Sequence, residues 1–273
     1  MSSSADNAVR RASTVCVLGV VALRLLTSAC GAAVSAAPSR AQGALSLLTP
    51  VVSLGGAYML LRHFGDMVPL AAPPAHKEDR VGTGRLLLLF PGAACGGMLT
   101  AELLARVFSL PGTGEIPTGT ALLWYAAANC LLAPTLEELL FRGAMQDLLR
   151  GHGDRFAVLG TSVLFALAHT DALRWPAALL CGAALGVCAV KTGSLRLSVL
   201  LHILYNLFQL VLLSCGVTPP LLILAFGLVL GAAQVRFCML TAGEEPTSAM
   251  LKRFFLTPAM LLLCAYAIAA ELL

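Results

Sequence analysis

The sequence predicts an all-α protein, a polytopic bundle of transmembrane helices with eight or nine spans. Of its 273 residues 58% are hydrophobic and only 12% are charged, whereas soluble domains carry roughly 25% charged residues. The apolar residues stand in long continuous runs, and only a helix pairs all the backbone groups of such a run inside lipid. Lipid is therefore the expected solvent for much of the chain, which makes it an integral, multi-pass membrane protein.

Nine apolar runs have about the length that a membrane-crossing helix needs, roughly 17 to 25 residues. We expect spans at residues 13–37, 43–62, 85–109, 119–149, 154–170, 174–190, 195–215, 218–240 and 253–273. The loops between them alternate between many and few Lys and Arg residues. Since basic residues collect on the cytosolic side, this alternation favours nine spans with a cytosolic N-terminus.

Ionisable residues inside these runs identify the candidate site, because a charge at membrane depth is costly and usually functional. Three segments contain them: Pro134-Thr135-Leu136-Glu137-Glu138-Leu139-Leu140-Phe141-Arg142-Gly143, Phe165-Ala166-Leu167-Ala168-His169 and His202-Ile203-Leu204-Tyr205-Asn206. Two of the five histidines of the chain lie in these segments. The three segments therefore predict one polar site built inside the membrane.

Helical spacing predicts different roles for the two neighbouring glutamates. Glu138 and Arg142 are four residues apart and share a helix face, so they can form an ion pair. Glu137 lies about 100° around the helix and is expected to face a cavity as a base. His202 and Asn206 share a face by the same four-residue spacing.

The sequence positions of Glu137 and His169 also predict that the two side chains lie at a similar depth in the membrane. Glu137 lies 14 residues before Gly151, and His169 lies 16 residues after Gly153. Two antiparallel helices joined at this glycine-containing turn would bring both side chains to a similar depth. We therefore expect the carboxylate and the imidazole to meet.

A carboxylate that takes a proton from water beside an imidazole is an arrangement for hydrolysis. A second histidine and an amide would supply N–H donors to a developing oxyanion. Zinc is the alternative, because a glutamate and two histidines could ligate it. The HExxH pattern is absent and the nine cysteines form no CxxC pair, so we expect no metal and no cofactor.

The three segments resemble the motifs of the CPBP family, the CAAX-protease and bacteriocin-processing family of intramembrane proteases. Those motifs are Glu-Glu-x-x-x-Arg, Phe-x-x-x-His and His-x-x-x-Asn/Asp, and here they occur in that order within residues 119–210. The resemblance implies an intramembrane glutamic endopeptidase that needs no metal. By this resemblance Glu137 and His169 activate water, and His202 and Asn206 form the oxyanion hole. Glu138 and Arg142 are expected to support them.

The resemblance leaves the substrate open. The family's eukaryotic branch removes the last three residues of prenylated CaaX proteins, and its prokaryotic branch is broader. The segment Ala168-His169-Thr170-Asp171 looks more like the broader branch. We expect membrane lipid and a peptide or protein substrate as partners, with a prenylated C-terminus as one option. No basic cluster of the nucleic-acid-binding kind is present, so nucleic acid is not expected.

Two other functions stay open at this point. A non-catalytic membrane scaffold or immunity-type protein of the same fold would be favoured by the loss of a motif residue. A small-molecule transporter would be favoured by inverted repeats with broken helices. The sequence has neither feature, so peptide-bond hydrolysis is the preferred interpretation.

The expected organisation of the chain follows from these motifs. The catalytic CPBP-like core covers 119–215, with transmembrane helices before it at 41–118 and after it at 216–273. Residues 1–40 allow two interpretations, because Arg24 interrupts their apolar run and Ala33-Val34-Ser35-Ala36-Ala37 resembles a cleavage site. They are either a removed targeting segment, which leaves eight spans, or the first transmembrane helix.

Overall fold

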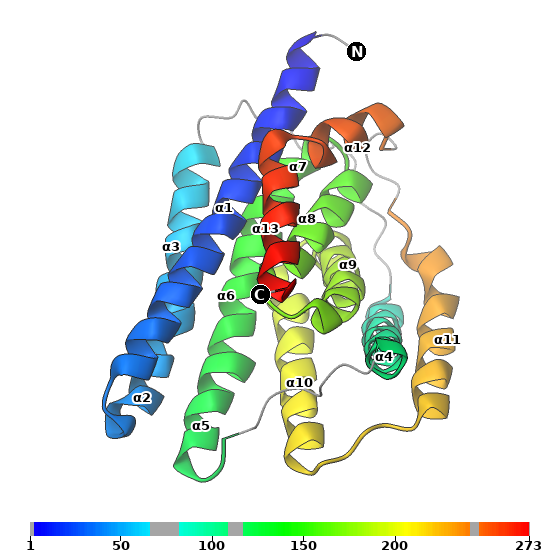
Figure 1. Cartoon of the computed structure of the whole chain (residues 1–273). Coiled ribbons are helices and arrows are strands. Elements are labelled where there is room, and N and C mark those ends of the chain that lie inside the picture. The colour runs from blue at the N-terminus through cyan, green and yellow to red at the C-terminus, as the bar shows by residue number, and fades with distance from the viewer. Residues whose placement is uncertain (1–2, 66–81, 109–116, 241–245, 273) are drawn as a thin grey trace.

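A computed structural model describes residues 3–65, 82–108, 117–240 and 246–272, and within these ranges the chain is helical without any strand. The protein is a helical membrane bundle, as the sequence predicts (Figure 1). Its α-helices are α1 Ser3–Ala36, α2 Ser39–Ser46, α3 Leu48–Gly65, α4 Thr83–Phe108, α5 Thr120–Ala126, α6 Ala133–Glu138, α7 Gln146–Arg150, α8 Asp154–Ala168, α9 Trp175–Thr192, α10 Leu195–Ser214, α11 Leu221–Cys238, α12 Ser248–Phe255 and α13 Pro258–Leu272. Two π-helical segments, η1 Ala127–Leu132 and η2 Leu139–Met145, and the 3₁₀ turn η3 Ala172–Arg174 complete it.

Six helical stretches of the described chain are long and apolar enough to cross a membrane. They are Asn7–Ala36, Ser39–Gly65, Thr83–Phe108, Ala172–Thr192, Leu195–Ser214 and Leu221–Cys238. The pair α12 and α13, bent by 62°, would make a seventh. The expected eight or nine spans are thus not confirmed, and the difference comes from the predicted runs 119–149 and 154–170.

These two runs carry the first two of the three polar motifs. From Thr120 to Arg150 one helical rod continues, but η1 and η2 interrupt its α-helical pairing, and its central part holds several charged side chains. Helix α8 has 15 residues, which gives about 22 Å at 1.5 Å per residue. That is shorter than a hydrocarbon core of roughly 30 Å.

Helix α1 is built into the bundle. Six of its apolar side chains belong to the largest buried cluster: Val9, Ala12, Cys16, Val17, Val20 and Leu23. A Cβ on Gly19 would lie 3.0 Å from the terminal carbon of Met145, so α1 packs directly on η2. The Ser13 hydroxyl donates to the Phe254 carbonyl at 2.7 Å. Helix α1 therefore packs, through residues 9–23, against the helix rod that carries the glutamates.

Small residues bring α4, α9 and α11 together behind the site. A Cβ on Gly92 would lie 2.3 Å from the Cα of Gly231, and one on Gly97 would lie 2.5 Å from the Cα of Ala177. Such close backbone approach is how helices pack in lipid without large side chains between them. In Figure 1, α4 and α9 are seen nearly end-on, so they cross the upright helices α1 and α3 steeply.

Candidate active site

The two glutamates lie at the junction of α6 and η2. Helix α6 ends at Glu138, and the π-helical segment begins at Leu139. Pi-helical turns are rare and frequently mark functional sites. The junction therefore places both carboxylates at an irregular point of a long helical rod.

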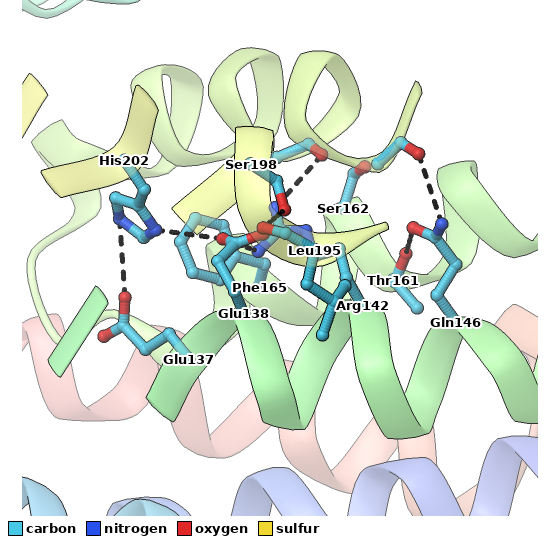
Figure 2. A network of polar contacts seen from close by, with 12 residues as sticks. Glu137, Glu138, Arg142, Gln146, Thr161, Ser162, Phe165, Leu195, Ser198 and His202 are labelled. Carbon is cyan, nitrogen blue, oxygen red and sulfur yellow. Dashed lines mark hydrogen bonds and ion pairs between the residues drawn. The ribbon is translucent and has the colours of Figure 1, made fainter. Parts of the chain in front are cut away.

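A row of polar side chains runs down one face of this rod. Arg142 Nη1 lies 2.8 Å from Glu138 Oε1, and both side chains are almost fully buried, at 1% and 0% exposure. Arg142 Nη2 also donates to the Gly182 carbonyl at 3.1 Å. One turn further, Gln146 Nε2 donates to the Gly186 carbonyl at 3.2 Å (Figure 2). We call Glu138, Arg142 and Gln146 the polar row, and it contains the ion pair that the spacing predicts.

Glycines on α9 make room for the polar row. A Cβ on Gly186 would lie 2.8 Å from Gln146 Oε1 and 3.1 Å from a methyl group of Val158. A Cβ on Gly182 would meet the Phe165 ring at 3.2 Å. Since buried polar groups must be hydrogen-bonded, these glycines let the α9 carbonyls come close enough to accept from Arg142 and Gln146.

The imidazole of His202 lies between the two glutamates. Its Nδ1 is 2.9 Å from Glu138 Oε1, and its Nε2 is 3.5 Å from Glu137 Oε2. The Glu137 side chain is 23% exposed, whereas that of Glu138 is completely buried. Figure 2 shows the ring reaching the two carboxylates with its two nitrogens. The sequence separates the glutamates by helix face but does not reveal that one histidine contacts both.

The two contacts of this ring are not equivalent. An ionised carboxylate only accepts hydrogen bonds, so the N–H at Nδ1 donates to Glu138 at 2.9 Å. The 3.5 Å between Nε2 and Glu137 Oε2 is longer than a usual N–H···O bond. His202 is therefore bonded to the buried glutamate and only faces the exposed one.

His169 leaves helix α8 at its last turn. It is the C-cap residue, with extended backbone angles of φ −76° and ψ 140°. Its Nδ1 lies 2.8 Å from the Phe165 carbonyl, and because a carbonyl only accepts, Nδ1 carries the proton. Nε2 then keeps its lone pair and can act as a base.

Two side-chain donors hold the end of α8, one remote in sequence and one close. Arg24 Nη1 of α1 donates to the Leu167 carbonyl at 3.2 Å, and Trp175 Nε1 donates to the His169 carbonyl at 3.0 Å. Arg24 is 3% exposed, and none of the carboxylates in the described residues pairs with it. The sequence shows Arg24 only as an interruption of an apolar run, and its position inside that run is the one signal that could have identified it.

The Phe165 ring packs against both histidines of the site. Its ring stands edge-on to Phe141 at 5.0 Å, His169 at 4.9 Å and His202 at 5.7 Å between centroids. The Arg142 guanidinium lies over it at 4.6 Å. A buried aromatic ring at this point sets the separation of the two histidines, which gives the phenylalanine of the second motif a physical purpose.

Asn206 lies one helical turn beyond His202 on α10. Its Nδ2 donates to the Asn129 carbonyl of η1 at 2.9 Å, so it links the α10 helix to the glutamate-bearing rod. One of its two amide N–H groups is used in this bond. The oxyanion role expected for His202 and Asn206 stays a prediction, as does the water-activating role of Glu137 and His169.

Comparison with known proteins agrees with the motifs. Residues 118–208 match the family model described as type II CAAX prenyl endopeptidase Rce1-like. Neither the curated proteins nor the solved structures gave a match to the chain. The matched range contains all three motifs and nearly equals the range over which the sequence resembles the CPBP proteases. The match over residues 118–208 therefore supports the CPBP, or CAAX protease, family for this part of the chain.

Proposed function

We propose that the protein is an intramembrane endopeptidase in which Glu137 activates a water molecule. The observation that carries this proposal is the contrast between neighbouring glutamates, since Glu137 is 23% exposed and Glu138 is completely buried. A base must reach water, and a buried carboxylate already bonded to Arg142 and His202 has no such access. Glu137 is therefore the carboxylate that can act as the base.

The reaction needs no group beyond those of the site. Glu137 takes a proton from water, and the resulting hydroxide attacks the carbonyl carbon of the scissile peptide bond. The same proton then passes to the leaving nitrogen, the C–N bond breaks, and the products are a carboxylic acid and an amine. His169 Nε2, which keeps its lone pair, holds the water beside Glu137.

The negative charge on the carbonyl oxygen needs N–H donors aimed at it. His202 Nε2 faces Glu137 at 3.5 Å, longer than a usual N–H···O bond, so a proton on this nitrogen would be available to the oxyanion. Asn206 has a second amide N–H besides the one bonded to Asn129. These two groups are our candidates for the oxyanion hole.

The substrate is a peptide or protein segment that enters from the membrane. The family match names prenyl endopeptidases, so a prenylated C-terminus is the first substrate to test. A non-prenylated membrane peptide is the second, because the segment after His169 looks like the broader branch of the family.

The test is cleavage of a panel of prenylated and non-prenylated peptides by the purified protein in lipid. We expect the wild-type protein to cleave at least one peptide and Glu137→Gln to lose about 10²- to 10⁴-fold in rate, the usual contribution of a general base. Glu102→Gln is the matched control, because Glu102 also lies in a membrane helix and pairs with Arg106 at 2.8 Å.

Three results would count against the proposed mechanism or function. Full activity in Glu137→Gln would refute the mechanism, and equal losses in both variants would mean that the effect is not specific. A folded wild-type protein that cleaves no peptide of the panel would favour the scaffold interpretation.

A further inference from the structure

A cavity of about 310 Å³ opens at the N-terminal end of α1, far in sequence from the family domain. Three cationic side chains line it, Arg10 from α1 and Lys252 and Arg253 from α12. None of the described residues that line it is acidic. The cavity is therefore a site where positive charge gathers from two ends of the chain.

The cavity is held by contacts that do not involve its cations. The Ser13 hydroxyl lies 3.1 Å from Thr257 Oγ1 and donates to the Phe254 carbonyl, which ties α1 to the bend between α12 and α13. Thr257 also accepts from the Met260 amide at 3.2 Å. Because this frame is buried and bonded, Arg10 and Lys252, both exposed, are held near each other without pairing to acids of the frame.

The cavity lies at the end of a candidate membrane helix, where lipid headgroups are expected. Arg10 lies in the first turns of the candidate span Asn7–Ala36, and Figure 1 places α12 at the same end of the bundle as the N-terminus. Helix α12 buries Met250 and Phe254 and exposes Lys252, which is the pattern of a helix lying in the membrane interface. Leu256, 60% exposed, adds an apolar wall suited to a lipid chain.

We propose that this cavity binds the phosphate of an anionic phospholipid headgroup, with Arg10 and Lys252 as its principal cations. Basic residues at the ends of membrane helices attract anionic lipids of the cytoplasmic leaflet, which is the side that the charge pattern predicts for the N-terminus. The lipid joins the ends of α1 and α12 and stabilises the packing of α1 in the bundle. The site is independent of the proposed catalytic function.

The experiment uses the full chain in detergent, titrated with dioleoyl phosphatidylglycerol while its melting temperature is recorded. Dioleoyl phosphatidylcholine and inorganic phosphate are titrated in parallel. We expect phosphatidylglycerol to raise the melting temperature well above the other two. Removing two cations with Arg10→Gln/Lys252→Gln should weaken the apparent affinity about thirty-fold, if each contributes as basic residues near a membrane surface do.

The matched control is Arg11→Gln/Arg62→Gln. It removes two exposed cations that do not line the cavity, at the same end of the bundle, and should keep the wild-type affinity. An equal loss of affinity in the control would show that general surface charge attracts the lipid, and it would overturn the proposed site. Stabilisation by inorganic phosphate to the same extent, with displacement of the lipid, would overturn the lipid assignment.

A variant that fails to fold would not obscure the result. Lys252→Gln alone changes one exposed side chain and should still lose about five-fold in affinity. Native mass spectrometry gives a second readout, since the wild-type protein should retain phosphatidylglycerol that Lys252→Gln releases. Equal retention by both proteins would contradict the proposal.

Discussion

The two sides of the glutamate-bearing rod differ in their access to water and in the origin of their partners. On the side of the polar row, Glu138, Arg142 and Gln146 are buried. Glu138 accepts from Arg142, and Arg142 and Gln146 donate to α9 carbonyls. On the other side, the Glu137 side chain is 23% exposed and its Oε2 lies 3.5 Å from His202 Nε2. Adjacent residues of the same type therefore lie in different environments, since one is buried in a bonded row and the other is accessible to water.

The largest effect should come from breaking the ion pair of the polar row. Glu138→Gln or Arg142→Gln leaves the partner charge buried and unpaired, which costs roughly 3–5 kcal/mol. The double variant should cost less than the sum of the two, because neither charge is then stranded. Glu137→Gln should cost little stability, since its carboxylate reaches water.

A double-mutant cycle of the free energy of unfolding in detergent checks this prediction, with cleavage rates measured alongside. Additive effects of Glu138→Gln and Arg142→Gln would refute the coupling. A large stability loss in Glu137→Gln would mean that the roles of the two glutamates are reversed.

A smaller effect, on the cleavage rate, should come from changing Arg24. This side chain lies on α1 and acts on His169 indirectly. Its bond to the Leu167 carbonyl holds the last turn of α8, from which His169 emerges. Arg24→Met removes this bond, and we expect kcat to fall about ten-fold, the equivalent of 1.4 kcal/mol of positioning. Arg24→Lys keeps a donor and should restore most of the rate.

The readout for Arg24 is the pH profile of kcat/KM together with the melting temperature. A positioning role predicts an altered profile in Arg24→Met, with KM nearly unchanged. Arg40→Gln, which changes an exposed cation of the same N-terminal region, is the control. If Arg24→Met keeps the wild-type rate and profile, α1 has no part in placing His169.

The third comparison tests the close packing of α9 on the polar row. Gly186→Ala puts a Cβ 2.8 Å from Gln146 Oε1, and overpacking of this kind typically costs 1–3 kcal/mol. Gly31→Ala adds the same methyl group to α1 where no atom lies within 4 Å, and it should be neutral or slightly stabilising. Melting temperatures of the two variants check this, and equal values would show that the polar row tolerates displacement.

The sequence predicts contacts within one helix of the site but not the contacts between helices. Hydropathy is enough for a helical membrane bundle, and the four-residue spacing is enough for the Glu138–Arg142 pair. The bridging by His202 joins residues 64 positions apart, and the Arg24 bond joins residues 143 positions apart. Spacing along one helix carries no information about such contacts.

The span count is not confirmed for a related reason. A π-helical turn pairs residues five apart and has no compositional signature, so η1 and η2 cannot be seen in the run 119–149. Helix α8 is shorter than its apolar run because His169 leaves the helix in an extended conformation. His169 thus ends one of the two helices that hydropathy predicts as spans, and η2, which begins after Glu138, interrupts the other.

The smallest expected effect is that of metal removal, for which we predict no change in cleavage rate. Glu138 Oε1 already accepts from Arg142 and lies 2.9 Å from His202 Nδ1, so the guanidinium and the imidazole take the place that a metal ion would need beside this carboxylate. The described residues contain no group of three or more His, Cys, Asp or Glu side chains that could hold a metal ion. Dialysis against a strong chelator, followed by the cleavage assay and metal analysis, tests this prediction. Activity that disappears with the chelator and returns with one equivalent of zinc would show that the site uses a metal.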